Sequence, residues 1–445
     1  MTPLLMAREV TARSAWLSVL WPSGSPPQVA EVRGGPAPVP IPLAPTPVPG
    51  SFGPPAAWHQ RMELTGLSPA SDYQLVLTES GTPVAECRVR TLPEGLPAIN
   101  APLNVLLASC YSRERDPTGA VGRAFLRLPP ASRPSLAVLT GDQVYLDTPI
   151  AHFLFRPHTG EQLATEFATN YAATFGQRFP DGGFGALVSS VATLMTGDDH
   201  ELWNNAPNVA VHLPDTWTPF GRDAWSTLAR QLYDAYQTPR RVHALEIPPL
   251  SARIVDTRFS RSADRTQIVD PQTMAELVSW LAGLTGPALL ALGQPILVPT
   301  TGFVGHFTDW ALADYAQYAE LALALTNVNH DVVLVTGDVH FGRVAEVQLP
   351  NGRRIVEIVS SPMALVDDRA GRNWRSPPSI FPARSIPGVV SAPVSVQPFQ
   401  TVENHLATLA LWAEGTSVRL EHTCWLIGAD GSQPQPVPGY SGRLH

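Results

Sequence analysis

The chain has 445 residues, of which 44% are hydrophobic and 15% charged, so it can bury a sizeable core and is not intrinsically disordered. The net charge of −8, from 30 basic and 38 acidic residues, argues against a dedicated nucleic-acid-binding protein. Three cysteines, Cys87, Cys110 and Cys424, are too few for a disulfide framework, although the sequence leaves a Cys87–Cys424 bridge open.

Membrane insertion and export are not indicated by the sequence. No apolar run approaches the roughly 20 residues that a transmembrane helix needs. The first residues, MTPLLMAREVTARS, contain neither the apolar core of a secretory signal nor a twin-arginine pair. We therefore expect a soluble, cytoplasmic protein from the sequence as it stands, and an exported, periplasmic protein if a signal has been removed.

Residues 6–92 have the pattern of short strands in which polar and apolar residues alternate. The segments AREVTARSAWLSVLWP, HQRMELTGL, YQLVLTES and AECRVRTL repeat this pattern at the spacing of a β-sandwich. The segment LTGLSPASDY, from Leu64 to Tyr73, resembles a corner of fibronectin type III-like sandwiches. Residues 34–55 are too rich in proline for a central strand and predict an extended surface loop. Residues 93–102 have the composition of a linker.

From Asn104 onward, strand-like runs alternate with helical spacing, which predicts a layered α/β domain. The segments with helical spacing are 161–175, 222–237, 272–283 and 309–326. Near the end of the chain the pattern returns to β structure. Residues 407–428 predict a hairpin with its turn at Glu414-Gly415.

Several of the apolar runs end in polar residues. The runs that begin at Leu136 and Val332 both finish in Thr-Gly-Asp, the run at Val105 is followed by Ser109-Cys110, and ATLMTG precedes Asp198-Asp199. Such runs predict buried parallel strands, and open α/β sheets place their active sites at the carboxyl ends of these strands. We therefore expect the anionic side chains to converge there and to bind metal ions.

Tyr145 and Cys110 indicate which metal this cluster prefers. Tyr145 follows Asp142 by three residues, so a tight turn would bring both side chains to one point. A phenol has a pKa near 10 and ionises only beside a strongly charged cation, which favours ferric iron. A thiolate from Cys110 also suits iron better than magnesium. Taken alone, each residue leaves a plain core position open as the alternative.

Other candidates come from the segment DDHELWNN and from the ends of two further strands. Asp199 and Asn204 offer the oxygen ligands that calcium and magnesium prefer, and His200 would donate a proton to a leaving group. Arg258 would clamp a phosphoryl oxygen with two hydrogen bonds. The alternatives are a solvated acidic loop, an Asp256–Arg258 structural pair and, at Asp338-Val-His340, a helix-capping carboxylate.

Six motifs, taken together and in order, resemble the alkaline phosphatase D (PhoD) family of metallophosphoesterases. They are ASC (108–110), GDQVY (141–145), DDHELWNN (198–205), VDTRFSR (255–261), the Trp-Leu pair at 280–281 and TGDVH (336–340). The commoner metallophosphoesterase pattern opens with D-x-H, where this chain has Ser109-Cys110. Two features depart from the family: the twin-arginine signal is missing, and Tyr111 replaces a polar residue, which would narrow substrate access.

The resemblance covers residues 104–445 and implies a fold and a set of ligands. The expected fold is α/β, with a four-layer α-β-β-α metallophosphoesterase domain at 98–445 preceded by a small all-β, fibronectin type III-like sandwich at 1–97. Fe³⁺ and Ca²⁺ are the implied cofactors, with other divalent metals as substitutes. The implied iron ligands are Cys110, Asp142 and Tyr145 with Asp338 nearby, and the implied calcium ligands are Asp142, Asp199, Asn204 and Asp338.

The function that follows is that of a metal-dependent phosphoesterase acting on a small-molecule phosphomonoester, phosphodiester or both. A metal-activated hydroxide would attack phosphorus, with Asp142 holding the metals. Arg258, His200 and His340 would contact the phosphate, and His200 would assist the leaving group. The alternatives are a phospholipid or nucleotide phosphodiesterase with the same metal centre, and a non-catalytic metal- or phosphate-binding module. The natural ester and the oligomeric state stay open.

Overall fold

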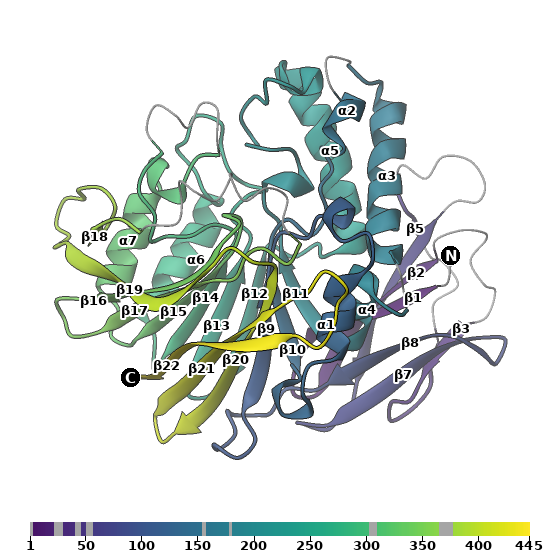
Figure 1. Cartoon of the computed structure of the whole chain (residues 1–445), viewed down its shortest axis with the longest axis horizontal. Helices are drawn as coiled ribbons and strands as arrows, with labels where there is room; N and C mark the ends of the chain where they lie inside the picture. The colour runs from purple at the N-terminus through teal and green to yellow at the C-terminus, as the bar shows by residue number, and fades with distance from the viewer. Residues whose placement is uncertain are drawn as a thin grey trace.

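The computed structural model describes residues 3–21, 30–40, 46–49, 57–153, 157–177, 180–301, 309–364 and 377–445. Within these residues, two four-stranded sheets come from the first 90 residues, and a six-stranded and an eight-stranded sheet come from the rest. Figure 1 shows the two large sheets at the centre, with helices on their outer sides. No helix in the described part of the chain is both long and apolar enough to cross a membrane.

The N-terminal region has the strand order of an immunoglobulin-type sandwich, with the first, second, sixth and fifth strands in one sheet and the fourth, third, seventh and eighth in the other. The strands are β1 (Leu4–Val10), β2 (Ser14–Trp21), β3 (Ala30–Arg33), β4 (Val39–Pro40), β5 (Thr46–Pro47), β6 (Trp58–Thr65), β7 (Asp72–Glu79) and β8 (Thr82–Arg90). At the corner that the sequence predicts, the Ser68 N–H donates to the Tyr73 hydroxyl at 2.8 Å.

The proline-rich segment 34–55 lies partly outside the described residues, which omit 41–45 and 50–56. Its described parts contribute β4 and β5, each only two residues long and each at the edge of its sheet. This placement suits proline, which cannot donate a hydrogen bond to a neighbouring strand.

The six-stranded sheet has the order β11-β10-β9-β20-β21-β22. Its members are β9 (Leu103–Ala108), β10 (Leu136–Thr140), β11 (Ala192–Thr196), β20 (His405–Glu414), β21 (Ser417–Leu426) and β22 (Gln435–Leu444). The first three are parallel, as predicted from their apolar runs. The predicted C-terminal hairpin is confirmed, because Glu414 of β20 pairs with Ser417 of β21 across the turn.

The eight-stranded sheet has the order β12-β13-β14-β15-β17-β16-β19-β18. Its members are β12 (Val242–Ile247), β13 (Leu250–Val255), β14 (Ala288–Leu292), β15 (Val332–Thr336), β16 (Gly342–Gln348), β17 (Arg354–Val359), β18 (Ile380–Phe381) and β19 (Ala392–Thr401). Strands β13, β14, β15 and β17 are parallel neighbours, so their carboxyl ends lie at one edge.

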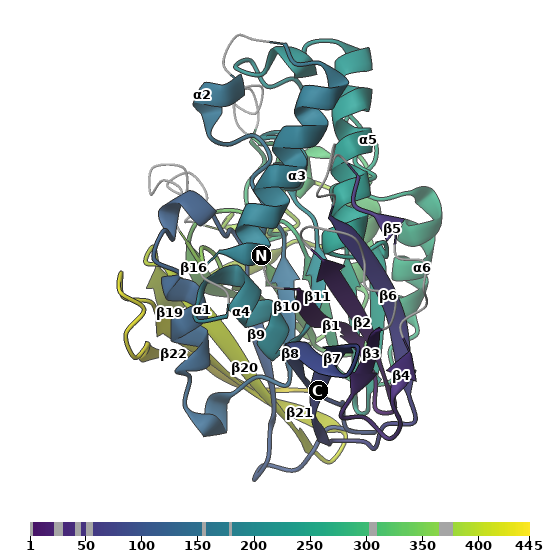
Figure 2. The same cartoon turned by 90° about the vertical axis from the view of Figure 1, so that its right-hand side faces the viewer.

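Seven α-helices lie in the described residues. They are α1 (Ala120–Leu126), α2 (Ile150–Phe153), α3 (Gly160–Gly176), α4 (Gly183–Ser190), α5 (Pro219–Tyr236), α6 (Pro271–Ala282) and α7 (Tyr318–Thr326). The side chains of Thr159, Thr218 and Asp270 accept hydrogen bonds from the first turns of α3, α5 and α6. These three helices confirm the predicted segments to within about three residues. Figure 2 shows α3 and α5 side by side, with α5 reaching down toward the N-terminal strands.

The helix predicted over 309–326 is wrong in its first half. Only Tyr318–Thr326 is α-helical, after a short 3₁₀ turn at Leu312–Asp314. The backbone is extended at Ala311 and again at Tyr315, so the helical spacing of the apolar residues does not reflect a continuous helix. The side chain of Asp309 instead pairs with Arg258, which holds this segment against the sheet edge.

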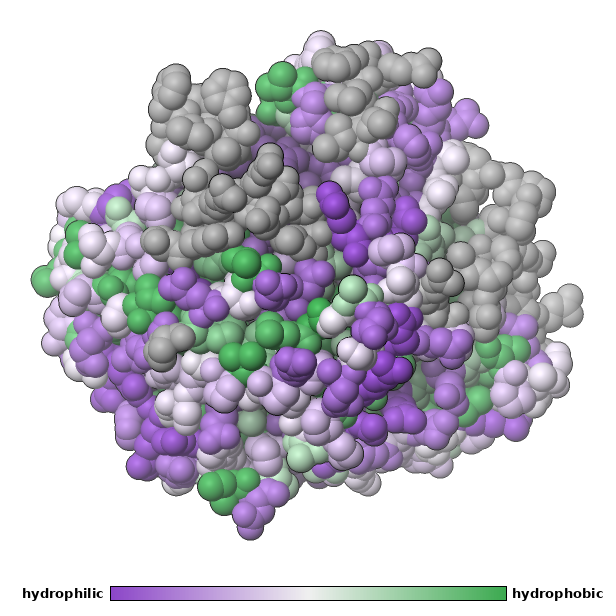
Figure 3. Space-filling model, in the orientation of Figure 1, coloured by the Kyte–Doolittle hydropathy of each residue, from purple (hydrophilic) through white to green (hydrophobic). Residues whose placement is uncertain are grey.

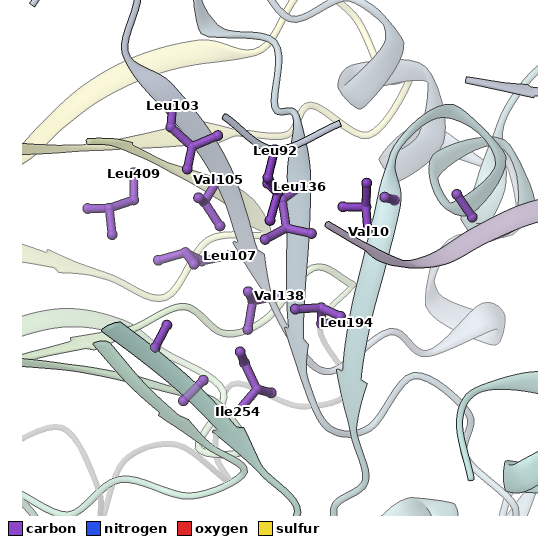
Figure 4. Packing of buried hydrophobic residues seen from close by; sticks show 14 of the residues in the cluster. Val10, Leu92, Leu103, Val105, Leu107, Leu136, Val138, Leu194, Ile254 and Leu409 are labelled. Atoms are coloured by element: carbon purple, nitrogen blue, oxygen red, sulfur yellow. The ribbon is translucent and has the colours of Figure 1, made fainter. Parts of the chain in front are cut away.

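The two large sheets share a core between them. Val105 and Leu107 of β9 lie in a cluster with Ile254 of β13, whereas Leu106 of β9 lies in a second cluster with the helices α1, α3, α4 and α5. This alternation is the two-residue period of a strand that is buried on both faces. Figure 4 shows Val105, Leu107, Val138 and Ile254 in the shared core, with Leu92 at its margin. A third cluster joins the other face of the eight-stranded sheet to α6 and α7.

The N-terminal strands extend the shared core, which includes Val10, Leu17 and Cys87 as well as Cys424 of β21. Cys87 and Cys424 are nevertheless free, buried thiols, so the bridge that the sequence left open is absent. On the face shown in Figure 3, hydrophobic and hydrophilic residues are interspersed among the described residues. The apolar residues that drive folding are therefore mostly inside.

Candidate metal centre

The parallel strands of both large sheets end in one region. After β9 come Ser109 and Cys110, after β10 comes Asp142, after β11 come Asp198 and Asp199, and after β15 come Asp338 and His340. Main-chain hydrogen bonds join these ends, from Cys110 N–H to the Gly141 carbonyl at 3.2 Å and from Gly337 N–H to the Gly293 carbonyl at 2.9 Å. The convergence that the sequence predicts at the strand ends is therefore present.

Four of the candidate residues have left-handed backbone conformations. The φ angles are 57° at Cys110, 58° at Asp142, 67° at Asp338 and 55° at His340. Such values are uncommon for residues with a side chain, and they persist only where the surrounding structure holds them. Each strand thus turns sharply at its end, and the turn directs the side chain into the space between the sheets.

Glycine precedes both aspartates of the Thr-Gly-Asp motifs because the loops approach too closely for a side chain. A Cβ atom at Gly141 would overlap the Asp198 side chain, and one at Gly337 would overlap that of Ser109. Gly141 also has a φ of 95°, which glycine adopts at little cost. The motif therefore combines a tight turn with a close contact between loops.

Two groups of side chains of the types that ligate metals share Asp142. In one group the donor atoms of Cys110, Asp142 and His340 lie within 4.8 Å of one another, and in the other those of Asp142, Asp199 and His200 do. The Cys110 Sγ lies 3.4 Å from Asp142 Oδ2. A thiolate with an imidazole suits iron or zinc, whereas the second group offers mainly carboxylate oxygen. The arrangement fits two cations that share one carboxylate.

Tyr145 and Asp338 lie close to these groups. Among the described residues the buried Tyr145 hydroxyl has no hydrogen-bond partner, and its ring centroid lies 4.1 Å from that of His200. Burial raises the pKa of Tyr145 well above its ordinary value, and the negative groups Cys110 and Asp142 raise it further. The Asp338 carbonyl oxygen lies 3.5 Å from Cys110 Sγ. A tyrosine ligand therefore requires a strong positive charge at this position.

The carboxylates of the cluster need cations to remain ionised. Burial raises the pKa of Asp142 and Asp338 well above the usual range, and the neighbouring aspartates add to the effect. Burial also raises the pKa of Asp198 to about 6, although Arg258 opposes the change. Buried oxygens of Asp198, Asp199 and Asn205 lack a hydrogen-bond partner among the described residues. Buried charges without partners are costly, so the donor set fits bound metal ions.

His200 is held by a carboxylate that the sequence analysis did not assign. Its Nδ1 lies 2.8 Å from Asp147 Oδ1, and Asp147 Oδ2 accepts a hydrogen bond from the Asn204 N–H at 2.8 Å. Burial lowers the pKa of His200, but Asp147, Asp199 and Asp142 outweigh it and keep the pKa well above its ordinary value. The second aspartate of GDQVYLD was the available signal.

Arg258 is buried in an internal ion-pair network. Its Nε lies 2.5 Å from Asp198 Oδ1, its NH2 lies 2.6 Å from Asp309 Oδ2, and its NH1 donates to the Ala206 carbonyl at 2.7 Å. Its own side chain is not exposed. The sequence left open a structural pair between Asp256 and Arg258. In the structure this pair involves only the main chain of Arg258, whose N–H donates to the Asp256 carboxylate at 2.9 Å.

Asn204 is exposed, whereas its neighbour Asn205 is buried and donates its N–H to Asp199 Oδ2 at 2.7 Å. Tyr111 is fully buried and stacks on Phe184 with ring centroids 5.1 Å apart. The expectation that Tyr111 narrows substrate access stays a prediction.

Three further polar residues support the cluster. Ser361, after β17, lies with its Oγ 3.1 Å from Cys110 Sγ and accepts a hydrogen bond from the His340 N–H at 3.1 Å. Gln294, after β14, donates to Asp338 Oδ2 at 2.9 Å and also contacts Asp309. Glu201 accepts main-chain hydrogen bonds from two of the loops. A polar residue directly after a strand was the signal for Ser361 and Gln294.

Comparison with known proteins defines the class of fold. No protein-family model matches the chain, and no curated protein matches it in sequence. Among solved structures, one described as "Structure of PhoD" matches 98% of this chain and 92% of its own, with a TM-score of 0.64 and 15% identity. A Bacteroides uniformis beta-glucuronidase 2 matches with a TM-score of only 0.20 and 9% identity, which carries no argument.

The chain therefore has a mixed α/β fold with buried donor groups at the strand ends. This is the fold of PhoD, and the resemblance first indicated by the six motifs is confirmed at the level of the fold.

Proposed function

We propose that this protein is a metal-dependent phosphoesterase of the PhoD type that hydrolyses small-molecule phosphomonoesters, phosphodiesters or both. The observation that carries the proposal is the position of Asp142, whose carboxylate belongs to two donor groups of different chemistry. Bound cations would attract the phosphate oxygens and lower the pKa of a water molecule. The PhoD fold supports the proposal independently.

The donor sets support different metals at the two positions. Cys110, Asp142, Tyr145 and His340 would hold ferric iron, because thiolate, phenolate and imidazole are all suited to it. Asp142 and Asp199, with Asp338 nearby, would hold calcium or another divalent ion through oxygen. Asn205 fits this second position better than Asn204, because it is buried beside Asp199. We thus propose His340 as a metal ligand in place of the phosphate contact expected from the sequence.

His200 would donate a proton to the leaving alkoxide. The Asp147 carboxylate fixes the imidazole at Nδ1 and favours its protonated form. For Arg258 we propose a different role from the one expected. Because its guanidinium already pairs with Asp198 and Asp309, it would balance the charge of the cluster and hold the two loops rather than clamp the phosphate.

The architecture that would position this centre is a four-layer α-β-β-α domain at 98–445 behind a fibronectin type III-like sandwich at 1–97. Two observations support it. Alternate residues of β9 face either the shared core or the helices, and the strand order of the N-terminal sheets is that of such a sandwich.

The test is Asp142→Asn, with Asp223→Asn as a control that removes an exposed carboxylate on α5. We expect Asp142→Asn to lose both metals, measured by elemental analysis, and to lose roughly 1,000-fold or more in turnover, because charge neutralisation carries most phosphoryl-transfer catalysis. Asp223→Asn should retain both properties. Full metal content and full turnover in Asp142→Asn would refute the proposal.

The substrate class is tested with a nitrophenyl phosphomonoester and a bis-nitrophenyl phosphodiester. The ratio of the two rates decides between a phosphatase and a phosphodiesterase. Metal-loaded protein that hydrolyses neither ester, nor a phospholipid or nucleotide ester, would be a binding module rather than an enzyme.

A further inference from the structure

Glu201 joins the two central ligand loops with a single buried carboxylate. Its Oε2 accepts hydrogen bonds from the N–H groups of Asp142 at 2.9 Å and Asp198 at 2.8 Å. Its Oε1 accepts from the N–H groups of Gln143 at 2.6 Å and Val144 at 3.2 Å. The side chain is fully buried and forms no ion pair with any described residue. Four of its hydrogen-bond partners are therefore main-chain donors of the loops after β10 and β11.

These hydrogen bonds stabilise a backbone conformation that is unfavourable for residues with a side chain. Asp142 has a φ of 58°, and Gly141, directly before it, has a φ of 95°. Residues in this region need surrounding contacts to keep them there. By binding the N–H groups of three consecutive residues from Asp142, Glu201 maintains the turn that directs the shared carboxylate. The same side chain fixes the start of the Asp198-Asp199 loop.

A path of hydrogen bonds leads from Glu201 to the N-terminal strands. Gln237, directly after α5, donates its side-chain amide to Glu201 Oε1 at 3.2 Å. The last carbonyl groups of α5 are bound by two arginines from the sandwich. Arg8 of β1 donates to the Tyr236 carbonyl at 2.5 Å, and Arg61 of β6 donates to the carbonyls of Asp234 and Gln237 at 2.5 and 3.2 Å. Cations are favourable at this end of a helix.

We propose that Glu201 is a positioning residue of the metal centre and that the N-terminal sandwich supports it through the end of α5 and Gln237. This inference rests on the proposed function, because it assumes that Asp142 binds metal. Glu201 itself would touch neither metal nor substrate. Instead, it would set the distance between the loops and so the affinity of the shared site.

The first test is Glu201→Gln, which keeps the shape but replaces one acceptor oxygen with an NH₂ group that faces main-chain donors. The readout is the dissociation constant of metal-stripped protein for Mn²⁺ and for Ca²⁺, measured by calorimetric titration. We expect affinity to fall about 10- to 100-fold, as is typical when a residue supporting metal ligands is lost. Saturating metal should restore most of the turnover, since the ligands themselves remain.

Asp331→Asn is the matched control. Asp331 is also buried and accepts main-chain hydrogen bonds, from Arg354 at 2.8 Å and His445 at 3.1 Å, but it lies at the opposite end of β15 from Asp338. It should lower the melting temperature without changing the metal dissociation constants. An equal loss of affinity in both variants would reduce Glu201 to a general contributor to stability and overturn the inference.

Gln237→Leu tests the link to α5 and keeps the inference testable if Glu201→Gln does not fold. It removes one donor to Glu201, and we expect roughly a fivefold loss of affinity, the usual effect of one hydrogen bond. Unchanged affinity in Glu201→Gln would overturn the proposal, and unchanged affinity in Gln237→Leu would overturn its link to the sandwich. Wild-type protein that binds neither ion would instead refute the proposed function.

Discussion

Asp142 combines a position at the end of a strand, an uncommon backbone conformation and a shared carboxylate. It ends a buried strand, adopts a left-handed conformation and contributes its carboxylate to two donor groups. Its burial among other acids raises its pKa in the metal-free protein, so bound cations and the ionised carboxylate stabilise each other. A position with a left-handed backbone is thus also the one whose carboxylate the two donor groups share.

Asp147→Asn should reduce turnover while leaving the metals in place. The change removes the carboxylate that holds His200 Nδ1 and keeps the group that accepts from Asn204. We expect kcat to fall about 10- to 100-fold, because a general acid that is poorly oriented loses most of its contribution. Elemental analysis should find the metal content unchanged. A variant with normal kcat would remove His200 from the proposed mechanism.

Tyr145→Phe should remove the phenolate band from the visible absorption of an iron-loaded protein. A phenolate bound to ferric iron gives a broad charge-transfer band. The buried Tyr145 hydroxyl, next to the donor groups, would supply this phenolate. The measurement is the absorption spectrum of protein purified without chelators, before and after the substitution. Colourless wild-type protein containing only calcium, magnesium or zinc would remove Cys110 and Tyr145 as iron ligands.

Sequence reasoning located the residues at the strand ends better than the residues that support them. Cys110, Asp142 and Asp338 follow runs whose burial is visible in the sequence, so their meeting at one edge was predictable. The roles of Glu201 and Asp147 depend on which loops face each other, and that is decided by packing between distant segments.

At the level of elements, the sequence predicted strands and helices with one regular pattern better than segments that combine several backbone conformations. The hairpin of β20 and β21 was predictable because both strands alternate over ten residues around a tight turn. Strands β16 and β17 were not assigned, although β17 delivers Ser361 to the cluster. Segment 309–326 has helical spacing throughout, but its backbone is extended at Ala311 and Tyr315, so only its second half is α-helical.

The same hairpin should make stability depend on pH. His405 of β20 and His422 of β21 are both buried. Burial lowers the pKa of His405 to about 4. Burial also lowers the pKa of His422 to about 3, and the charge of His405 adds to this shift. Above pH 6.5 these histidines are neutral in the folded and unfolded states. Below it, the unfolded chain takes up protons that the folded chain cannot, so the free energy of unfolding falls by roughly 1.4 kcal/mol per histidine per pH unit.

His422→Leu checks this dependence. Denaturant titrations between pH 6 and pH 5 should show a smaller loss of stability per pH unit than in the wild type, while the comparison between pH 7 and pH 8 should show no difference in slope. Other groups also titrate in the acid range, but they are common to both proteins. Identical slopes in the acid range would show that His422 is not held neutral.

At the scale of the whole molecule, the sandwich and the large sheets share one core. Val10 and Leu17 belong to the same cluster as Leu107 and Ile254, and Arg8 reaches Thr193 of β11 at 3.1 Å. Domains that fold separately have their own hydrophobic cores, whereas here one cluster contains residues of both parts. The sequence predicted the two parts but could not show their union, because each strand pattern reports only that a face is buried and not what covers it.

We therefore expect the two parts to unfold together. Calorimetry of metal-free protein should show one main transition, and Arg8→Met should lower its midpoint without splitting it, since Arg8 binds the end of α5 as well as β11. A separate early transition for the N-terminal strands would contradict this expectation.

The reactivity of the three cysteine thiols can report the order in which parts of the molecule unfold. Cys87, Cys110 and Cys424 are exposed by only 2%, 0% and 0%, and they lie in the sandwich, at the candidate metal centre and in the C-terminal hairpin. A thiol-reactive dye should therefore leave the folded chain unlabelled. The order in which the three peptides become labelled under mild denaturation would reveal, without any engineered probe, which part of the protein loosens first.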